Sequence, residues 1–454
     1  MIIVLISRKV SNLRRCNMKK AFLVLSVIVL VVCTISAGGK TEKSQAAQPI
    51  TLSLWGGWPE IQPVYEKVAA DYTKLHPNVT IKILTHPLRE FEQKLSATIP
   101  ADQASDIIEA SPYPVQKFIA AGLLPPAPPK IVEYMTKAGR FPEALVEANK
   151  GEDGKYYGLN YFQGRHAIFW NTDMFKEAGL PGAPKTMDEL ISYAQKLAKR
   201  DAQGNLIRSG LSLRLSGGGS GVGEKFWMYL YPFGGSIIEQ APNGKWKAGY
   251  NNEAGFNTLK MYIDMVWKFK TDDHKIKHDA EAFQLQQTAM FARESWVIGD
   301  TKKKAPALNY DTAPMPRGTR WGDLSTGVNL YVSRSCKNPD TAWDFILFLN
   351  SDENLRYLLD TTGWLPQRMD ADLKASLDKE PRYKAFLFSH PDYKIFTYPT
   401  LPEYDEILTK FAERMVKAFL DSSLVDNPDG IRKVLADAAA ETNAILKRAG
   451  KLAE

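Results

Sequence analysis

The stretch ITLSLWGGWPEIQP, residues 50–63, contains the pattern that decides the fold. Apolar side chains alternate along residues 50–55, which predicts a strand, and VTIKIL from Val79 alternates in the same way. Between them, apolar side chains recur on one helical face at Val64, Val68, Tyr72 and Leu75. A strand, a helix and a second strand in this order predict a parallel pair with a right-handed crossover, and such sheets bind ligands at the carboxyl ends of their strands.

Similar signals continue along the body of the chain. Residues 105–110 (SDIIEA) predict a strand, and the helix that follows is expected to end at Gly122. Further amphipathic helices are expected at residues 186–200, 338–351 and 426–450. Thr186 and Glu189 have the spacing of a capping box at the first of these. The expected fold class is α/β, and 454 residues are enough for two lobes of ordinary domain size.

Residues 1–37 have the pattern of a secretory signal peptide. Met18 is followed by two lysines, residues 21–32 are apolar except for Ser26, and small residues surround Ala37. The apolar run is shorter than the roughly 20 residues that a spanning helix needs, so cleavage is favoured over a membrane anchor. The start at Met1 or Met18 remains open, and residues 38–48 are expected to form a flexible tether.

The composition is that of a soluble globular protein, with 44% hydrophobic and 24% charged residues. The leader contributes six of the 58 basic residues and no acid, so the remainder carries 52 basic against 51 acidic residues. The formal net charge of +7 therefore falls to about +1, which leaves no basic field for nucleic acid.

Cysteine is rare in this chain. Cys16 and Cys33 lie in the leader and only Cys336 lies in the body, so the body has no intramolecular disulfide and no thiolate metal site. Leu30 stands three residues before Cys33, as in the cleavage site of a bacterial lipoprotein, although Val32 is a poor residue there. Lipid attachment at Cys33 and simple cleavage after Ala37 both remain open.

Tryptophan marks the expected ligand edge of the sheet. Trp55 and Trp58 are expected in the turn after the first strand, beside two glycines that let a ligand approach the backbone. Similar strand-to-loop settings are expected at Trp227, Trp296, Trp321 and Trp364. Each ring alone is consistent with a core residue, because aromatic side chains dominate cores. Together, they favour a stacking surface for sugar rings, with nearby polar groups that bond the hydroxyls.

Five motifs carry a resemblance to a known family: LWGGWPE, AAGLLPP, YGLNYFQGRHAIFWNTDMFKEAGLP, AMFARESWVIGD and TTGWLPQR. In this order they resemble the family 1 extracellular solute-binding proteins, the carbohydrate-binding subunits of bacterial ABC importers. The likeness runs from about residue 49 to the end. It implies a maltose-binding-protein-like monomer, exported to the periplasm or tethered to the outer face of the membrane. Such a protein needs no cofactor and delivers a carbohydrate to permease subunits.

The resemblance also implies a type II-like periplasmic-binding-protein fold, in which each of two lobes is a central sheet flanked by helices and the ligand cleft lies at the hinge. By this likeness, lobe one holds residues 49–162 and 311–350, and lobe two holds residues 163–310 and 351–454. The implied hinge segments are residues 159–165, 310–315 and 350–352.

Aromatic ligand contacts are implied at six positions, namely Trp55, Trp58, Trp227, Trp296, Trp364 and Tyr404. Trp296 matches the tryptophan that stacks on a sugar ring in relatives, and Trp227 matches an aromatic residue at the head of a lobe-two helix. Glu294 replaces the family's usual glycine and is expected to alter the pocket floor. Packing at the edge of a lobe is the alternative for Trp55 and Trp58.

The polar candidates are Glu109, Ser111, Tyr113, Arg165, Asp323 and Gly327. Glu109 and Ser111 end the strand at residues 105–110, and relatives place hydroxyl-binding groups in the loop that follows. Glu109 is equally consistent with a solvated surface carboxylate. Arg165 either pairs with the carboxylate of a uronic acid through its planar fork or forms a salt bridge at the hinge.

Other chemistries lack support. His274 and His278 have helical spacing but no zinc-protease glutamate and no third ligand, so no metal is expected. SGGGSGVGE lacks the lysine of a phosphate loop. A secreted glycoside hydrolase or another carbohydrate-modifying enzyme remains the alternative, because acids are plentiful. A neutral oligosaccharide is the expected ligand, with a uronate, a glycerol phosphate or a polyol left open.

Overall fold

The first two strands pair as the sequence predicts. In the computed structural model, which describes residues 48–277 and 279–453, β1 (Ile50–Gly56) runs parallel to β2 (Val79–Thr85), with Ile50 opposite Val79. The helix α2 (Gln62–Leu75) connects them, and its buried residues include Val64, Val68 and Tyr72. Leu52 and Leu54 are fully buried, which explains the alternation along β1.

β1 and β2 belong to a six-stranded sheet, here called the large sheet, in the order β14-β4-β13-β3-β1-β2. Its other strands are β3 (Ile107–Ala110), β4 (Leu159–Gly164), β13 (Thr326–Val332) and β14 (Leu365–Pro366). Only the pairs of β1 are parallel; β13 is antiparallel to β3 and β4. The large sheet is therefore mixed rather than parallel. β13, which a long stretch of chain separates from β4, runs opposite to β3 and β4.

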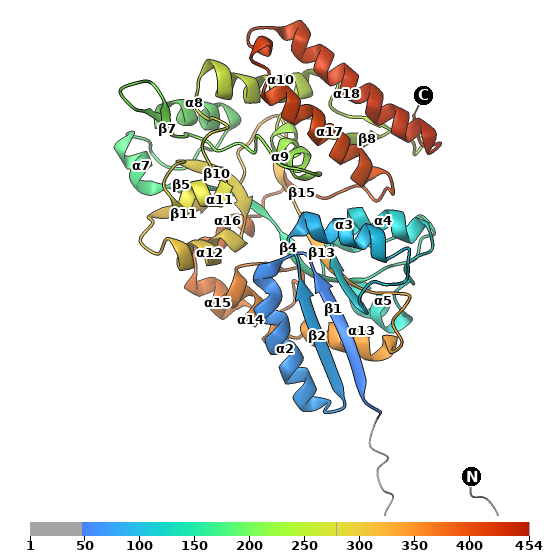
Figure 1. The fold of residues 1–454 in the computed structure, drawn as a ribbon. Helices are drawn as coiled ribbons and strands as arrows, with labels where there is room; N and C mark the ends of the chain where they lie inside the picture. The colour runs from blue at the N-terminus through green and yellow to red at the C-terminus, as the bar shows by residue number, and fades with distance from the viewer. Residues whose placement is uncertain (1–47, 278, 454) are drawn as a thin grey trace, which may run out of the picture. The chain divides into compact units, whose positions relative to one another are not determined.

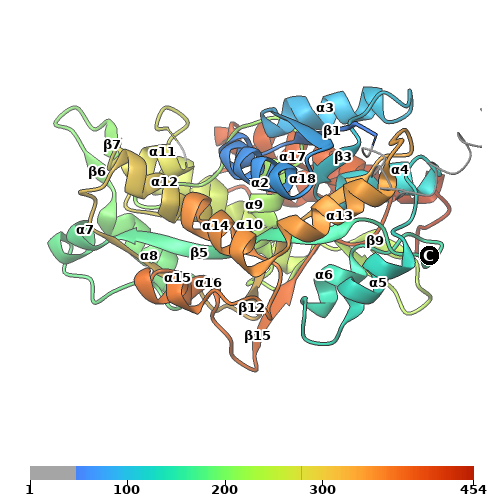
Figure 2. The ribbon, with the colours of Figure 1, turned by 90° about the horizontal axis from the view of Figure 1, so that it is seen from below.

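A second sheet, here called the small sheet, has the antiparallel order β10-β5-β11. Its strands are β5 (His166–Asn171), β10 (Met290–Glu294) and β11 (Tyr310–Ala313). Arg165 alone separates β4 from β5, so the chain passes directly from the large sheet to the small one. Figure 2 shows β5 running away from the group of α2, α13 and α14.

Helices cover both sheets (Figure 1). The helices that connect strands of the large sheet directly are η1 (Pro59–Ile61), α2, α3 (Leu88–Thr98), α4 (Pro112–Ala120), α5 (Pro129–Thr136), α6 (Glu143–Glu147), α13 (Pro339–Leu349) and α14 (Asp352–Thr362). The remaining helices are α7 (Thr172–Glu177), α8 (Met187–Leu197), α9 (Gly221–Leu230), α10 (Glu253–Ile263), η2 (Asp264–Lys268), α11 (Asp279–Gln284), α12 (Trp296–Lys304), α15 (Lys374–Lys379), α16 (Tyr383–Phe386), α17 (Tyr404–Phe419), η3 (Ser422–Leu424) and α18 (Pro428–Arg448). Short two-stranded pairings join β6 (Lys199–Arg200) to β7 (Leu206–Arg208), β8 (Ile238–Gln240) to β9 (Trp246–Ala248), and β12 (Trp321–Leu324) to β15 (Tyr393–Phe396).

The largest apolar cluster is built by α8, α9, α10, α17 and α18. A second cluster lies against the large sheet and continues to Phe169 and Phe291 of the small sheet, and a third joins α3 and α4 to β3. The predicted helix cap is present, because the Thr186 side chain accepts a hydrogen bond from the Glu189 amide at 3.1 Å.

The lobe limits stay a prediction, but two pairings favour a change in them. β11 lies at the predicted start of the second part of lobe one, residues 311–350, yet it pairs with β5 of the small sheet. Residues 352–366, predicted in lobe two, form α14, which contacts α2, and β14, which pairs with β4 of the large sheet. By these pairings, β11 groups with the small sheet and residues 352–366 group with the large sheet, the reverse of the predicted lobes.

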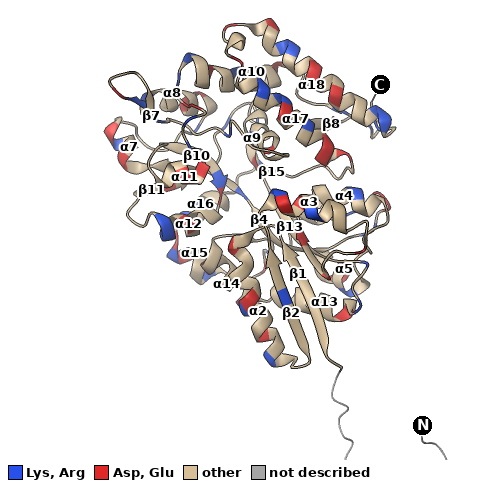
Figure 3. Cartoon of the chain, viewed as in Figure 1, with Lys and Arg blue, Asp and Glu red and all other residues tan. Residues whose placement is uncertain are grey.

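The predicted leader, with Cys33 and Ala37, and the tether up to residue 47 lie outside the described residues. Within residues 48–277 and 279–453, no helix combines the length and the apolar character needed to cross a bilayer. Figure 3 shows acidic and basic residues interspersed along α2, α17 and α18.

Candidate ligand-binding cleft

A cleft of about 680 Å³ lies between loops of the large sheet and elements of the small sheet and the largest cluster. Its walls come from the turn after β1, the starts of α3, α4 and α9, the junction of β10 with α12, and the end of α14. Five of the predicted site residues line it: Trp58, Ser111, Tyr113, Trp296 and Trp364.

Three tryptophans form an aromatic wall in this cleft. The ring of Trp58 meets Phe162 edge-on with centroids 5.5 Å apart, and Phe162 lies 5.1 Å from Trp364. Trp364 in turn lies 6.4 Å from Trp296. Trp58 and Trp296 are half-buried, whereas Trp364 is only 4% exposed. The first two rings therefore offer surface to a ligand, and Trp364 mainly supports them.

The two glycines of LWGGWPE allow the turn that places Trp58. A Cβ at Gly56 would lie 2.9 Å from Oε2 of Glu109, and one at Gly57 would lie 2.9 Å from the Phe91 ring. Glu109 is fully buried behind this turn, where it accepts hydrogen bonds from the Tyr65 hydroxyl and, at 3.3 Å, from the Gly57 amide. Burial raises the pKa of Glu109 to about 8. The alternative of a solvated surface carboxylate is wrong, and Glu109 supports the turn from outside the cleft.

Trp296 is held by Glu294, the residue that replaces the family's glycine. Its indole N–H donates to Oε2 of Glu294 at 3.2 Å, and the Arg293 guanidinium lies 5.3 Å from its ring centroid. Although burial alone would raise the pKa of Glu294, the charges of Arg293 and Lys225 and the contact with His166 hold it well below its usual range. Glu294 thus stays ionised and fixes the indole at the cleft surface.

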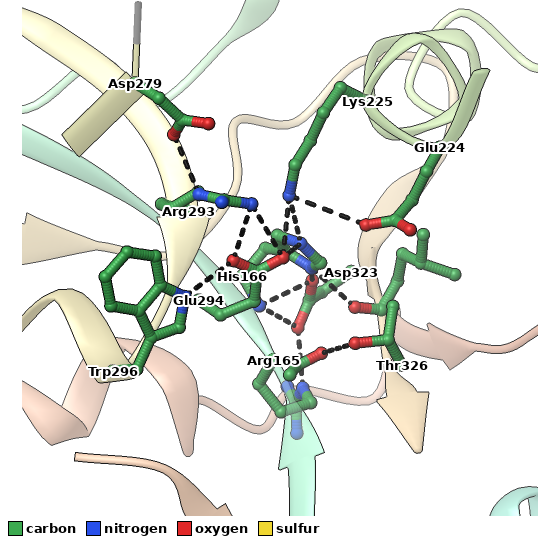
Figure 4. Close-up of polar contacts among 12 residues, drawn as sticks. Arg165, His166, Glu224, Lys225, Asp279, Arg293, Glu294, Trp296, Asp323 and Thr326 are labelled. Atoms are coloured by element: carbon green, nitrogen blue, oxygen red, sulfur yellow. Dashed lines mark hydrogen bonds and ion pairs between the residues drawn. The ribbon is translucent and has the colours of Figure 1, made fainter. Parts of the chain in front are cut away.

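Lys225, His166 and Glu294 form a buried contact between α9, β5 and β10 (Figure 4). The Lys225 ammonium lies 2.7 Å from Oε1 of Glu294 and 2.8 Å from Nε2 of His166. His166, Glu224 and Glu294 bring ligand atoms within 4.8 Å of one another, the spacing of a metal site. Because the Lys225 ammonium already provides a cation at this point, the group has no need of a metal ion.

Arg165 and Asp323 form an ion pair, with Nε of Arg165 2.6 Å from Oδ2 of Asp323. The Asp323 carboxylate also accepts the His166 amide at 3.0 Å, and neither residue lines the cleft. Of the two predicted roles for Arg165, the structure contains the salt bridge at the crossing between the sheets. Asp323 pairs with Nε of Arg165, and Arg165 does not line the cleft, so the structure gives no support for a uronate at this arginine.

Tyr113 and Ser111 open α4 at the cleft. The Tyr113 hydroxyl lies 2.8 Å from Oγ of Ser220, just before α9, so this contact spans the cleft. Trp227 and Tyr404 lie one layer deeper: Trp227 is 5% exposed, and Tyr404 is fully buried. They pack on Tyr398 and Tyr113, which do line the cleft.

Two expectations about position are wrong, and a third predicted residue lies beside the cleft rather than in its wall. Trp227 is not at a strand-to-loop junction but inside the helix α9, with its ring in the core. Trp55 belongs to β1 rather than to the turn, and the Lys94 ammonium covers its ring at 3.6 Å from the centroid. Gly327 lies in β13, where a Cβ would come 3.3 Å from Nε2 of Gln367, and its neighbours Thr326 and Val328 line the cleft instead.

Comparison with known proteins gives the family. A family model described as bacterial extracellular solute-binding protein matches residues 67–385. The chain belongs to this family. Membership makes it an exported binding protein rather than an enzyme, which confirms the predicted class of function.

Similar proteins cover most of this solute-binding protein. A putative binding protein of Brucella abortus is 24% identical over 394 residues, 85% of this chain and 90% of its own. The arabinooligosaccharide-binding protein of Bacillus subtilis is 25% identical over 391 residues, 81% of this chain and 84% of its own. An ABC transporter solute-binding protein of Thermotoga lettingae, solved with α-D-tagatose, superposes with a TM-score of 0.75 at 20% identity, covering 87% of this chain and 99% of its own. This structural likeness confirms the predicted two-lobed fold.

Several charged residues of the cleft have no counterpart among the predicted site residues. Arg89, Arg214, Glu224 and Arg293 line it, together with Glu294. They come from four separate elements or loops, and no spacing motif connects them in the sequence of the solute-binding protein. The glycine-rich stretch before α9 is the one local feature of the sequence that points to these charged residues, because Arg89 and Arg214 approach its backbone.

Proposed function

We propose that this solute-binding protein captures a carbohydrate, an oligosaccharide, in the cleft and delivers it to the permease subunits of an ABC importer. The observation that carries the proposal is the pair of half-buried rings, Trp58 and Trp296, in a cleft of about 680 Å³. This volume lies within the usual range of about 300–1,000 Å³ for ligand sites. The named ligands of the Bacillus and Thermotoga proteins are also carbohydrates.

The wall combines the two kinds of contact that sugars need. The C–H faces of a sugar ring pack on indole faces, where apolar area leaves water. Arg89, Arg293 and Ser111 line the same cleft and offer donors and acceptors for hydroxyl groups. A secreted hydrolase would need two carboxylates free to act on the bond, whereas Glu294 and Glu224 are engaged by Lys225 and by the Tyr398 hydroxyl.

Closure around the ligand is part of the proposal. Tyr113 of α4 contacts Ser220 before α9, and Lys117 of α4 pairs with Asp405 of α17 at 2.9 Å. A sugar bound to both walls adds contacts that exist only when the walls are close together, so it shifts the protein toward the closed state. The crossing at Arg165 and the segment after β11 are the proposed hinges.

Calorimetric titration with oligosaccharides, followed by chromatography of the mixture, tests the proposal. We expect binding at a molar ratio of about one to one, with the sugar recovered unchanged. Cleavage or other conversion of the bound sugar would contradict it, and so would saturation at several equivalent sites.

We also propose that residues 1–37 direct export and that the protein acts as a monomer, either free in the periplasm or attached through Cys33. Mass spectrometry of the N-terminal peptide from cells separates the two forms. A lipid-modified Cys33 supports the tether, a start at Gly38 supports free protein, and an intact Met1 or Met18 would contradict processing.

A further inference from the structure

Arg214 is a charged group of the cleft that neutral sugar binding does not explain. It follows β7, and its side chain lines the cleft. Across residues 48–277 and 279–453, no carboxylate lies within 4.0 Å of its guanidinium, and its Nε is buried without a hydrogen-bond partner. The neighbouring arginines differ: Arg89 pairs with Glu92 at 2.5 Å, and Arg293 pairs with Asp279 at 2.8 Å.

Arg89 approaches Arg214 from the other wall. Arg89 belongs to α3, and both guanidiniums approach Gly221 at the start of α9. A Cβ at Gly221 would lie 3.0 Å from Nη2 of Arg89 and 3.1 Å from Cζ of Arg214. Two like charges this close repel each other, and Glu92 compensates the charge of Arg89 but pairs with no other arginine here.

Three acids that line the cleft are engaged by other groups and form no ion pair with Arg214. Glu224 accepts the Tyr398 hydroxyl at 2.7 Å, Glu294 is occupied by Lys225, and Asp300 pairs with Lys304 at 3.1 Å. Burial, together with the charge of Arg293, lowers the pKa of Arg214, although the charges of Asp279 and Glu224 act in the opposite direction. The first turn of α9 adds unpaired N–H groups and the positive end of its dipole beside the same point.

We propose that Arg214, with Arg89 beside it, receives an oxyanion of the bound sugar, a carboxylate or a phosphate ester. This inference rests on the proposed carbohydrate capture and narrows its ligand to an acidic carbohydrate. A planar guanidinium binds either oxyanion with two parallel hydrogen bonds, which neutral hydroxyls do not match. Because Arg89 and Arg214 stand on opposite walls, the oxyanion also links the walls and favours closure.

Titration of the purified protein with paired sugars tests the ligand class. The members of each pair differ in their oxyanions: digalacturonate, with two carboxylates, against galactobiose, cellobiuronate, with one, against cellobiose, and glucose 6-phosphate against glucose. We expect an acidic sugar to bind about 10-fold or more tightly than its neutral partner, and the pair that responds identifies carboxylate or phosphate. Equal or tighter binding of a neutral partner overturns the inference and leaves carbohydrate capture intact. Binding of none of the six counts against carbohydrate capture, and the inference falls with it.

Variants of Arg214 test the site itself. Arg214→Gln should weaken binding of the acidic sugar by about 10- to 100-fold, and Arg214→Lys should fall between it and the wild type because it keeps the charge without the planar fork. Arg334→Gln, an exposed arginine paired with Asp102 at 2.8 Å, is the matched control and should leave the affinity unchanged. An unchanged acidic-to-neutral affinity ratio in Arg214→Gln overturns the inference.

A measurement without ligand separates binding from folding. Removing an unpaired, partly buried charge is neutral or stabilising, so the melting temperature of ligand-free Arg214→Gln should equal or exceed that of the wild type. A marked fall in melting temperature would mean that Arg214 holds the fold together, and it would overturn its assignment to the ligand.

Discussion

Replacement of Trp296 by alanine tests whether the aromatic wall binds sugar. If a sugar ring covers about 60 Å² of the indole, burial of that surface contributes about 1.5 kcal/mol at about 25 cal/mol per Å², and about 3 kcal/mol if the sugar loses as much apolar surface of its own. Trp296→Ala should therefore raise Kd by about 10- to 150-fold. Trp58→Ala should behave similarly, because both rings are half-buried at the same wall.

The stability of the same variants gives the control. Trp364 is only 4% exposed and donates to Glu60 at 3.1 Å, so Trp364→Ala should lower the free energy of unfolding by about 3–5 kcal/mol. Trp296→Ala should cost much less, because part of its ring already faces the cleft and its chief polar contact is the bond to Glu294. Trp296→Phe keeps an aromatic face and should retain most of the affinity.

Calorimetry for Kd and urea denaturation for stability are the two assays. Trp296→Ala and Trp58→Ala proteins that bind the sugar like the wild type but unfold far more easily would refute the reasoning, since both rings would then be core residues.

Three other outcomes follow from the structure. Burial raises the pKa of Glu109 to about 8, above its unfolded value, so the folded protein binds the extra proton between about pH 4.5 and 8 and loses up to about 1.4 kcal/mol of stability per pH unit as pH rises. Glu109→Gln should flatten this slope in denaturation curves; equal slopes would show that Glu109 does not titrate there. Asp323→Ala leaves Arg165 unpaired and should cost about 3–5 kcal/mol, whereas the exposed Asp378→Ala should have little effect, and equal losses would contradict the importance of the pair. Small-angle scattering should show a smaller radius of gyration at saturating sugar, and an unchanged radius counts against hinge closure.

The fold was predictable where the signal is local. The alternation of β1, the face of α2 and the cap of α8 each depend on residues a few positions apart, and all three are present, although Leu75, predicted on the α2 face, is 65% exposed. The direction of β13 was not predictable in this way, because its partners β3 and β4 lie far from it in the chain.

The candidate site was predictable in part. Trp58 and Trp296 line the cleft, but Trp227 is equally aromatic and lies in the core, since periodicity along one helix does not show what packs above it. Charge pairing is even harder to predict from the sequence. Arg165 finds Asp323 across 158 positions of sequence, while Arg214 finds no acid, and only the folded chain distinguishes the two arginines.

A crystal structure of the protein with the tightest-binding sugar tests the central claim most directly. The account predicts one sugar molecule in the cleft, with a ring stacked on Trp296 or Trp58 and its covalent structure intact. A sugar bound elsewhere on the protein, with both indoles free of ligand, would contradict it.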